Sequence, residues 1–250
     1  MNSLIARLSH RSIRGLFAAG IVALAVVGLK AAFDEATAGS RYRIVFFGDS
    51  LTEQAEYRRG FISLLRAQLP AMPDGRRPLL IGAGRSGNRV PDLEQRLERD
   101  VLARRPDEVV IFIGINDVWH SLRGSGTPLP EYEAGLRRMI QRIKAQGATV
   151  TLCTPTAIGE RAGGANPFDS QLDEYADAVR RIAAAEGLAV VDLRKTFFER
   201  LGEADEGVQP TADAARPPLT TDGVHLSAAG NALVAEQLLE HFEARATESR

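Results

Sequence analysis

Cysteine is nearly absent from this 250-residue chain, since Cys153 is its only one. A single cysteine cannot form a disulfide within the chain, so the fold must depend on its hydrophobic core, which a chain of this length can supply. Cys153 lies in an apolar run and is expected to be a packed thiol rather than a reactive one. These features exclude a small disulfide-stapled scaffold.

The chain also lacks a strong excess of charge of either sign, because its formal net charge is −1. Basic residues alternate with acidic ones, as over residues 92–99, which is typical of the solvated face of a helix. Nothing in this pattern indicates a nucleic-acid partner. No cluster of His, Cys, Asp or Glu has metal-ligand spacing and no phosphate-binding glycine motif occurs, so the sequence predicts no metal and no cofactor.

The N-terminus has the pattern of an export signal. Three arginines precede an apolar run over residues 15–29, and a small-x-small cleavage site follows at 36–38. The run is shorter than the roughly 20 residues that a spanning helix needs. We therefore expect residues 1–38 to be a cleaved signal of a periplasmic or secreted protein. The alternative is an uncleaved anchor that tethers residues 39–250 to the membrane, facing away from the cytoplasm.

Behind this segment, apolar runs typical of strands alternate with amphipathic stretches typical of helices. Strands apolar along their whole length, separated by helices, predict a parallel sheet covered on both faces. We expect one three-layer α/β/α domain around a central parallel five-stranded sheet. Strands are expected at 43–47, 79–81, 108–114, 149–153 and 188–193, and helices at 60–69, 91–105, 131–146, 169–186 and from Ser227 to about residue 244.

Polar, glycine-containing loops follow three of the expected strands. They are Gly-Asp-Ser at 48–50, Gly-Arg-Ser-Gly at 84–87 and Gly-Ile-Asn-Asp at 114–117, and Asp-Gly-Val-His at 222–225 precedes the last helix. Taken singly, each is better explained by a turn, a helix cap or a satisfied surface histidine. Because the carboxyl ends of parallel strands meet at one edge of a sheet, we expect the loops to converge around Ser50.

In this order the four blocks resemble those of the SGNH hydrolases, the GDSL esterase/lipase family. The matching residues are 48–53, 86–88, 114–117 and 222–225, and the resemblance extends from about residue 43 to 242. It implies the flavodoxin-like fold of that family. It also implies a carboxylic ester hydrolase that works without a cofactor.

The resemblance implies that Ser50 is the nucleophile, His225 its general base and Asp222 the residue that orients the imidazole. These roles agree with the chemistry of the side chains, because a serine hydroxyl attacks poorly until a base takes its proton. Histidine can do so near neutral pH. Gly223 would let the chain curl between the acid and the base.

The implied oxyanion hole consists of the backbone N–H groups of Ser50 and Gly87 and the side-chain amide of Asn116. Glycine at 87 allows a bare N–H to approach the substrate, and an amide remains a donor at any working pH. One departure from the family is visible. Gly82 stands about where an asparagine is common, which predicts the loss of a supporting hydrogen bond in that loop.

The substrate is less well defined by the sequence. Trp119 could stack on a sugar ring or an acyl chain, or pack in the core, and Arg85 could meet an anionic group or remain solvated. The acidic segment 201–221 is expected to wall the pocket, and its lack of apolar stretches favours a short acyl group such as an O-acetyl on a carbohydrate. The alternatives are a lysophospholipase or thioesterase, or an inactive carbohydrate-binding module on the same fold. The oligomeric state is not set by the sequence.

Overall fold

A computed structural model of the chain describes residues 41–72, 76–161, 164–202 and 217–248. The expected signal or anchor at 1–38 and most of segment 201–221 lie outside these residues. Tyr42–Arg250 form one compact unit. Within the described ranges, no helix has the length and apolar character that crossing a membrane requires.

Five parallel strands form the central sheet, as predicted. They follow the order β2-β1-β3-β4-β5, which is the flavodoxin-like order. The register aligns Gly48 of β1 with Gly84 of β2 and Phe112 of β3, so these strands end together. The strands are β1 (Tyr42–Gly48), β2 (Pro78–Gly84), β3 (Glu108–Phe112), β4 (Thr149–Cys153) and β5 (Ala189–Val191).

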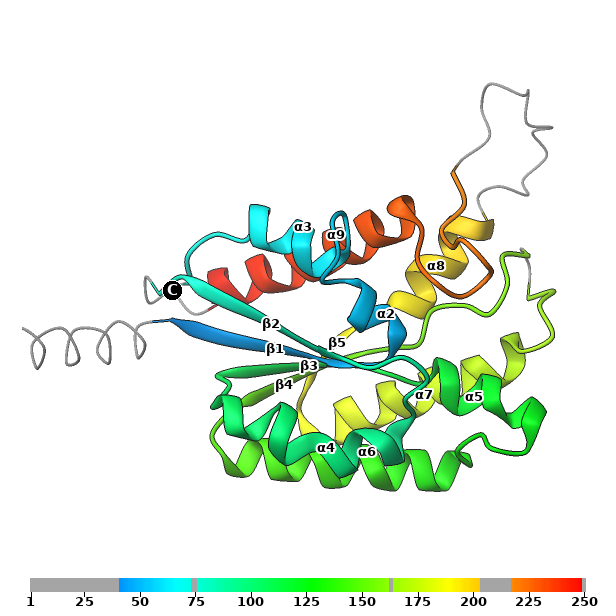
Figure 1. Cartoon of the computed structure of the whole chain (residues 1–250), viewed down its shortest axis with the longest axis horizontal. Coiled ribbons are helices and arrows are strands. Elements are labelled where there is room, and N and C mark those ends of the chain that lie inside the picture. Colours follow the sequence, from blue (N-terminus) through cyan, green and yellow to red (C-terminus); the bar gives the residue numbers. More distant parts are fainter. Residues whose placement is uncertain (1–40, 73–75, 162–163, 203–216, 249–250) are drawn as a thin grey trace, which may run out of the picture. The chain divides into compact units, whose positions relative to one another are not determined.

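Helices cover both faces of the sheet. In Figure 1, α2, α3, α8 and α9 lie on one face and α4, α6 and α7 on the other. The α-helices are α2 (Ser50–Gln54), α3 (Phe61–Gln68), α4 (Val90–Asp100), α5 (Ile115–Trp119), α6 (Leu129–Ala145), α7 (Asp169–Glu186), α8 (Leu193–Gly202) and α9 (Ala228–Glu248). Two 3₁₀ turns occupy Leu102–Arg104 and His120–Arg123.

Several predicted boundaries are wrong: the strand expected over 108–114 ends at Phe112, the one expected over 79–81 runs to Gly84, and the last helix runs to Glu248. The helix expected over 91–105 ends at Asp100 and continues only as a 3₁₀ turn. The strand expected over 188–193 ends at Val191, because Asp192 begins α8 by accepting a hydrogen bond from the Lys195 N–H at 3.2 Å.

The predicted solvated face over residues 92–99 also needs correction, because one of its arginines is buried. Only 6% of Arg96 is exposed. Its neighbours Leu93 and Leu97 belong to the core, where α4 packs against the sheet. Cys153 is buried as predicted, and burial raises the pKa of its thiol.

A buried carboxylate ties the last helix to the amino end of the sheet. Glu108, at the start of β3, is fully buried and accepts a hydrogen bond from the Thr151 hydroxyl at 2.7 Å. It also pairs with Arg245 of α9 at 2.5 Å. Burial raises the pKa of Glu108, but the nearby His241 and Arg245 and the bond from the Thr151 hydroxyl outweigh burial, so the net shift is downward. A buried charge of this kind is tolerated because its oxygens have partners.

We expect Thr151→Val to lower the free energy of unfolding by about 1–3 kcal/mol, because the buried Glu108 oxygen loses a donor. Urea unfolding measures the loss. Thr149→Val is the matched control, since its hydroxyl bonds at an exposed position at 3.3 Å and should cost less than about 0.5 kcal/mol. Equal losses in the two variants would contradict this reading of the cluster.

Candidate active site

The candidate site lies where the strand order reverses. Ser50 begins α2 directly after β1, and Asn116 lies in α5 directly after β3, the neighbouring strand. In open α/β sheets, the carboxyl ends of strands at such a switch point form the ligand crevice. The sheet therefore brings two of the predicted blocks together.

The turn into α2 buries the serine and its flanking residues. Asp49 is 1% exposed and Ser50 5% exposed, and Asp49 caps the helix by accepting from the Leu51 N–H at 2.9 Å. Gly48, the last residue of β1, has no room for a side chain. A Cβ there would lie 2.3 Å from the Phe112 carbonyl oxygen, so the glycine is required by close packing.

Asp222, His225 and Ser50 form a continuous hydrogen-bonded row. His225 Nε2 lies 3.1 Å from Ser50 Oγ, and His225 Nδ1 lies 2.7 Å from Asp222 Oδ2. Asp222 Oδ1 also accepts the N–H of His225 at 2.8 Å, and Gly223 between them has φ +91°. The curl that the sequence predicts for Gly223 is therefore present.

The charge of Asp222 is stabilised by the same contacts. Partial burial raises the pKa of this carboxyl, but hydrogen bonds from the His225 ring and from two backbone N–H groups outweigh burial and hold the pKa below its ordinary value. An ionised Asp222 accepts from Nδ1–H, which leaves the lone pair of Nε2 directed at the Ser50 hydroxyl.

The segment that carries Asp222 and His225 has no helix or strand of its own, and a neighbouring loop holds it. Glu160 accepts hydrogen bonds from the Leu219 N–H at 3.2 Å and from the N–H and hydroxyl of Thr220. Gly159 N–H donates to the carbonyl of Gly223 at 2.7 Å. Sequence reasoning missed Glu160, because its partners are about 60 residues away and no local pattern marks the pairing.

Asn116 and the loop after β2 lie together. Asn116 is 5% exposed, and its Nδ2 donates to the Asn88 carbonyl at 3.0 Å, which leaves the second amide hydrogen free to donate. Gly87 precedes Asn88 in this exposed loop and has φ +76°. Ser50 is the first residue of α2, so its N–H has no acceptor within the helix.

Two glutamates that follow the serine fasten α2 to β2 and its loop. Glu53 accepts from the N–H of Ser86 at 2.9 Å and from its hydroxyl. Glu56 accepts from the N–H of Gly82 at 2.7 Å. Gly82 lies within β2 and not in the loop that follows it. The supporting hydrogen bond that the sequence predicts to be lost at Gly82 is therefore not lost from that loop. The loop itself is held by Glu53.

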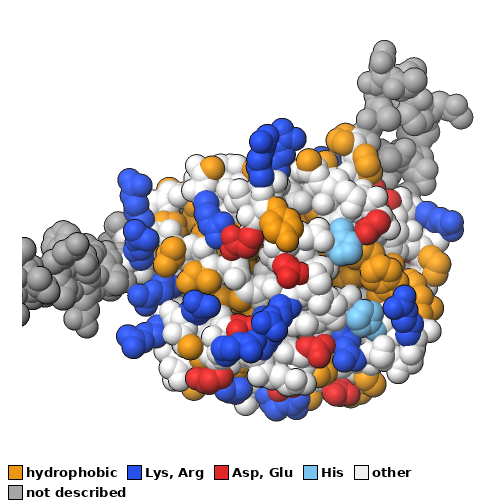
Figure 2. Space-filling model, in the orientation of Figure 1, with side chains coloured by type: hydrophobic (Ala, Val, Ile, Leu, Met, Phe, Trp, Pro, Cys, Tyr) orange, Lys and Arg blue, Asp and Glu red, His pale blue; other side chains and the backbone are white. Residues whose placement is uncertain are grey.

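The two predicted substrate contacts are at the surface. Trp119 ends α5 and is 36% exposed, and Arg85 is exposed in the loop beside Gly87. On the face shown in Figure 2, two histidine side chains lie beside a patch of hydrophobic side chains. Trp119 and Leu122 are among the large hydrophobic residues that remain exposed.

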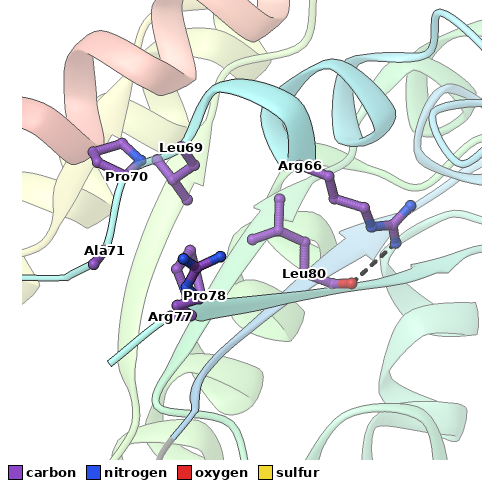
Figure 3. A pocket seen from close by; sticks show the side chains of 7 residues that line it. All are labelled: Arg66, Leu69, Pro70, Ala71, Arg77, Pro78 and Leu80. Atoms are coloured by element: carbon purple, nitrogen blue, oxygen red, sulfur yellow. Dashed lines mark hydrogen bonds between the residues drawn. The ribbon is translucent and has the colours of Figure 1, made fainter. Parts of the chain in front are cut away.

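A pocket of 310 Å³ lies away from these residues. Figure 3 shows it between the end of α3 and the start of β2, lined by Leu69, Pro78 and Arg66, which donates to the Leu80 carbonyl. This is the amino end of β2, whereas Ser50 follows the carboxyl end of β1. In the part of the chain that the structure describes, no group of His, Cys, Asp and Glu is arranged to hold a metal ion.

Two buried acids lie behind the serine. Burial is the main cause that raises the pKa of Asp49 to about 7, with the Leu51 N–H bond opposing the shift and the nearby charge of Asp117 adding to it. Burial also raises the pKa of Asp117 to about 6, against its hydrogen bonds, which include one at 3.0 Å from the Val90 N–H. Ionising either acid next to the other is therefore unfavourable.

The chain is similar in sequence and in structure to known esterases. The model of the GDSL-like lipase/acylhydrolase family matches residues 46–233. An acetylxylan esterase of Geobacillus stearothermophilus is 31% identical over 220 residues, which are 82% of this chain and 95% of the relative. An isoamyl acetate-hydrolyzing esterase 1 homolog of Mus musculus is 28% identical over 76% of each chain. The crystal structure of the acetyl xylan esterase AlAXEase is 37% identical with a TM-score of 0.71, covering 80% of this chain and 98% of that one.

We expect the raised pKa of Asp49 to appear as pH-dependent stability. Between its ordinary pKa of about 4 and its folded pKa of about 7, the folded protein holds a proton that the unfolded chain releases. The free energy of unfolding of the wild type should therefore fall with rising pH in this window, relative to Asp49→Asn. Urea unfolding of both proteins from pH 4 to 8 measures the difference, with Asp177→Asn at an exposed position as control. A difference that does not change with pH would rule the expectation out.

Proposed function

The chain belongs to the GDSL-like lipase/acylhydrolase family and is a carboxylic ester hydrolase, and on that premise we propose that it removes O-acetyl groups from carbohydrates through an acyl-enzyme on Ser50. The observation that carries the proposal is the row in which His225 Nε2 lies 3.1 Å from Ser50 Oγ and Nδ1 2.7 Å from Asp222. This is the relation that nucleophile, base and orienting acid need.

In the proposed first half-reaction, Ser50 Oγ attacks the ester carbonyl while His225 Nε2 takes its proton. The tetrahedral intermediate collapses as the same Nε2 returns that proton to the leaving sugar oxygen, and the acetyl group remains on Ser50. Water then attacks the acetyl-serine with His225 again as base, which releases acetate and restores the hydroxyl. Asp222 stays ionised and stabilises the imidazolium formed in each half.

The oxyanion of both intermediates would be bound by Ser50 N–H, Gly87 N–H and the Asn116 amide. The bond from Asn116 to the Asn88 carbonyl supports this role, because it fixes the orientation of the amide and leaves one hydrogen for the substrate. Donors held in place in this way need no reorganisation when negative charge develops. Each is typically worth about 2.7–4 kcal/mol of transition-state stabilisation.

The names of the relatives support an acetyl substrate. One group is named for acetylxylan and the other for isoamyl acetate, so the named esters share the acetyl group and differ in the alcohol. We assign the sugar side of the ester to Trp119, whose exposed ring offers an apolar face at the end of α5. Arg85 would contact an anionic group on the glycan.

A polymeric glycan substrate also favours export. Such a substrate lies outside the cytoplasm, and the basic and apolar pattern of residues 1–38 is that of an export signal. We therefore propose that the esterase acts outside the cytoplasm, either released or held by residues 15–29.

Ser50→Ala should reduce kcat for p-nitrophenyl acetate by at least about 10³-fold, because no other group supplies the acyl-accepting oxygen. A fluorophosphonate probe should label the wild type and not the variant, as shown by intact mass. Ser170→Ala, at an exposed position of α7, controls for loss of a serine hydroxyl. Esterase activity that survives in purified Ser50→Ala would disprove the assignment of the nucleophile.

A substrate panel tests the acyl group and the alcohol. We expect kcat/KM for p-nitrophenyl esters to fall at least about 10-fold from acetate to octanoate, because extra methylenes exceed a pocket made for acetyl. Acetylated xylooligosaccharides should release acetate faster than isoamyl acetate does. Faster hydrolysis of octanoate, of a lysophospholipid or of an acyl thioester would instead favour the alternative acyl hydrolases.

A further inference from the structure

Arg96 of α4 is a buried cation close to the proposed oxyanion hole. Only 6% of it is exposed, and its guanidinium lies over the ring of Phe47, 4.6 Å from the ring centroid. Asp100, one turn later in the same helix, pairs with it at 3.1 Å. Removing a guanidinium from water is costly unless its N–H groups find acceptors. The acceptors that Arg96 uses are therefore informative.

Three of its hydrogen bonds reach three separate segments around Ser50. Nη2 donates to the Gly48 carbonyl at 2.7 Å, Nη1 to the Ala83 carbonyl at 2.8 Å and Nε to Asn88 Oδ1 at 2.7 Å. Gly48 is two residues before Ser50, and Ala83 lies at the end of β2. One rigid fork thus connects the end of β1, the end of β2 and the loop that follows β2.

Each proposed oxyanion donor lies on, or is bonded to, one of these segments. The Ser50 N–H follows Gly48, and the Gly87 N–H directly precedes Asn88. The third donor is linked through the same loop, because Asn116 Nδ2 donates to the Asn88 carbonyl. Asn88 therefore connects Arg96, through its side chain, with Asn116, through its backbone.

A second buried arginine shows a different pattern. Arg194 is 3% exposed, and two carboxylates neutralise it, those of Asp169 at 2.8 Å and Asp173 at 2.7 Å, while its remaining bonds go to the carbonyls of Thr156 and Asp169. Arg96 has one carboxylate partner, Asp100, and its other bonds go to neutral oxygens next to the site. A guanidinium that only anchored α4 would not need to reach the ends of two strands.

We propose that Arg96 is the positioning residue of the oxyanion hole, setting the distances between its three donors. The inference rests on the proposed esterase function. Arg96 itself does not touch the substrate and acts by holding Gly48, Ala83 and Asn88 in register. A shift of about 1 Å in such a constellation can cost about 10²-fold in rate.

The test compares Arg96→Lys with wild type on p-nitrophenyl acetate. Lysine keeps the charge beside Asp100 but cannot serve three acceptors in different directions. We expect kcat to fall about 10- to 100-fold, with KM within about 3-fold of wild type, because the donors act on the transition state more than on bound ester. Full kcat in Arg96→Lys would overturn the proposal.

Two controls separate positioning from stability. Thr151→Val removes a buried hydrogen bond at the amino end of the sheet and should leave kcat unchanged at temperatures where it is folded. Asp100→Asn removes the ion pair of Arg96 but none of its three bonds toward the site, and should keep kcat within about 3-fold of wild type. A kcat loss in either control equal to that of Arg96→Lys would count against positioning.

Two further variants keep the test decisive if Arg96→Lys does not fold. Asn88→Ala removes only the acceptor of Nε and should lower kcat about 3- to 10-fold. In an Asn116→Ala background this loss should shrink, because residues that act through one another are not additive. Losses that multiply would overturn the proposal.

If wild type itself fails to hydrolyse acetate esters, the proposed function fails. An active wild type whose Arg96 and Asn88 variants have unchanged kcat refutes only this inference.

Discussion

The contact between His225 Nε2 and Ser50 Oγ, at 3.1 Å, joins residues 175 positions apart in the sequence. Neither partner lies in the interior of a long helix or strand. Ser50 begins a five-residue helix and His225 lies in a segment without regular structure. The distance therefore depends on how accurately the sheet edge and the surrounding loops are held.

That accuracy comes from charged side chains which bind backbone groups of the loops and strand ends. Glu160 accepts hydrogen bonds from backbone N–H groups shortly before Asp222, and Glu53 accepts one from the Ser86 N–H. Arg96 donates to backbone carbonyls at the ends of two strands. The bonds of Glu53 and Arg96 fix the loop after β2 to α2 and α4, and those of Glu160 fix the segment before Asp222 to the loop after β4. Backbone groups make suitable attachment points, because fixing them fixes the chain itself.

Much of this arrangement follows from the sequence, and the part that does not has a physical reason. The sheet and the blocks around Ser50, Asn116 and His225 are marked by local runs and spacings. The start of α8 was missed because Asp192 caps a helix in a stretch that otherwise has the pattern of a strand. The sequence predicts a solvated face for Arg96, because helical periodicity does not reveal the hydrogen-bond acceptors that other segments place beside it. Long-range pairing of single side chains leaves no local signal.

The order of the parts along the chain has a consequence for biosynthesis. The strand that carries the proposed nucleophile is made early, whereas His225 stands three residues before α9, the last helix. Asn231 of α9 accepts the Phe61 N–H at 2.9 Å, which docks that helix on α3. During synthesis the chain therefore contains Ser50 before its proposed base, His225, has been added. If these two residues act together as proposed, ester cleavage has to wait until the segment that carries His225 has been made and held against the sheet edge.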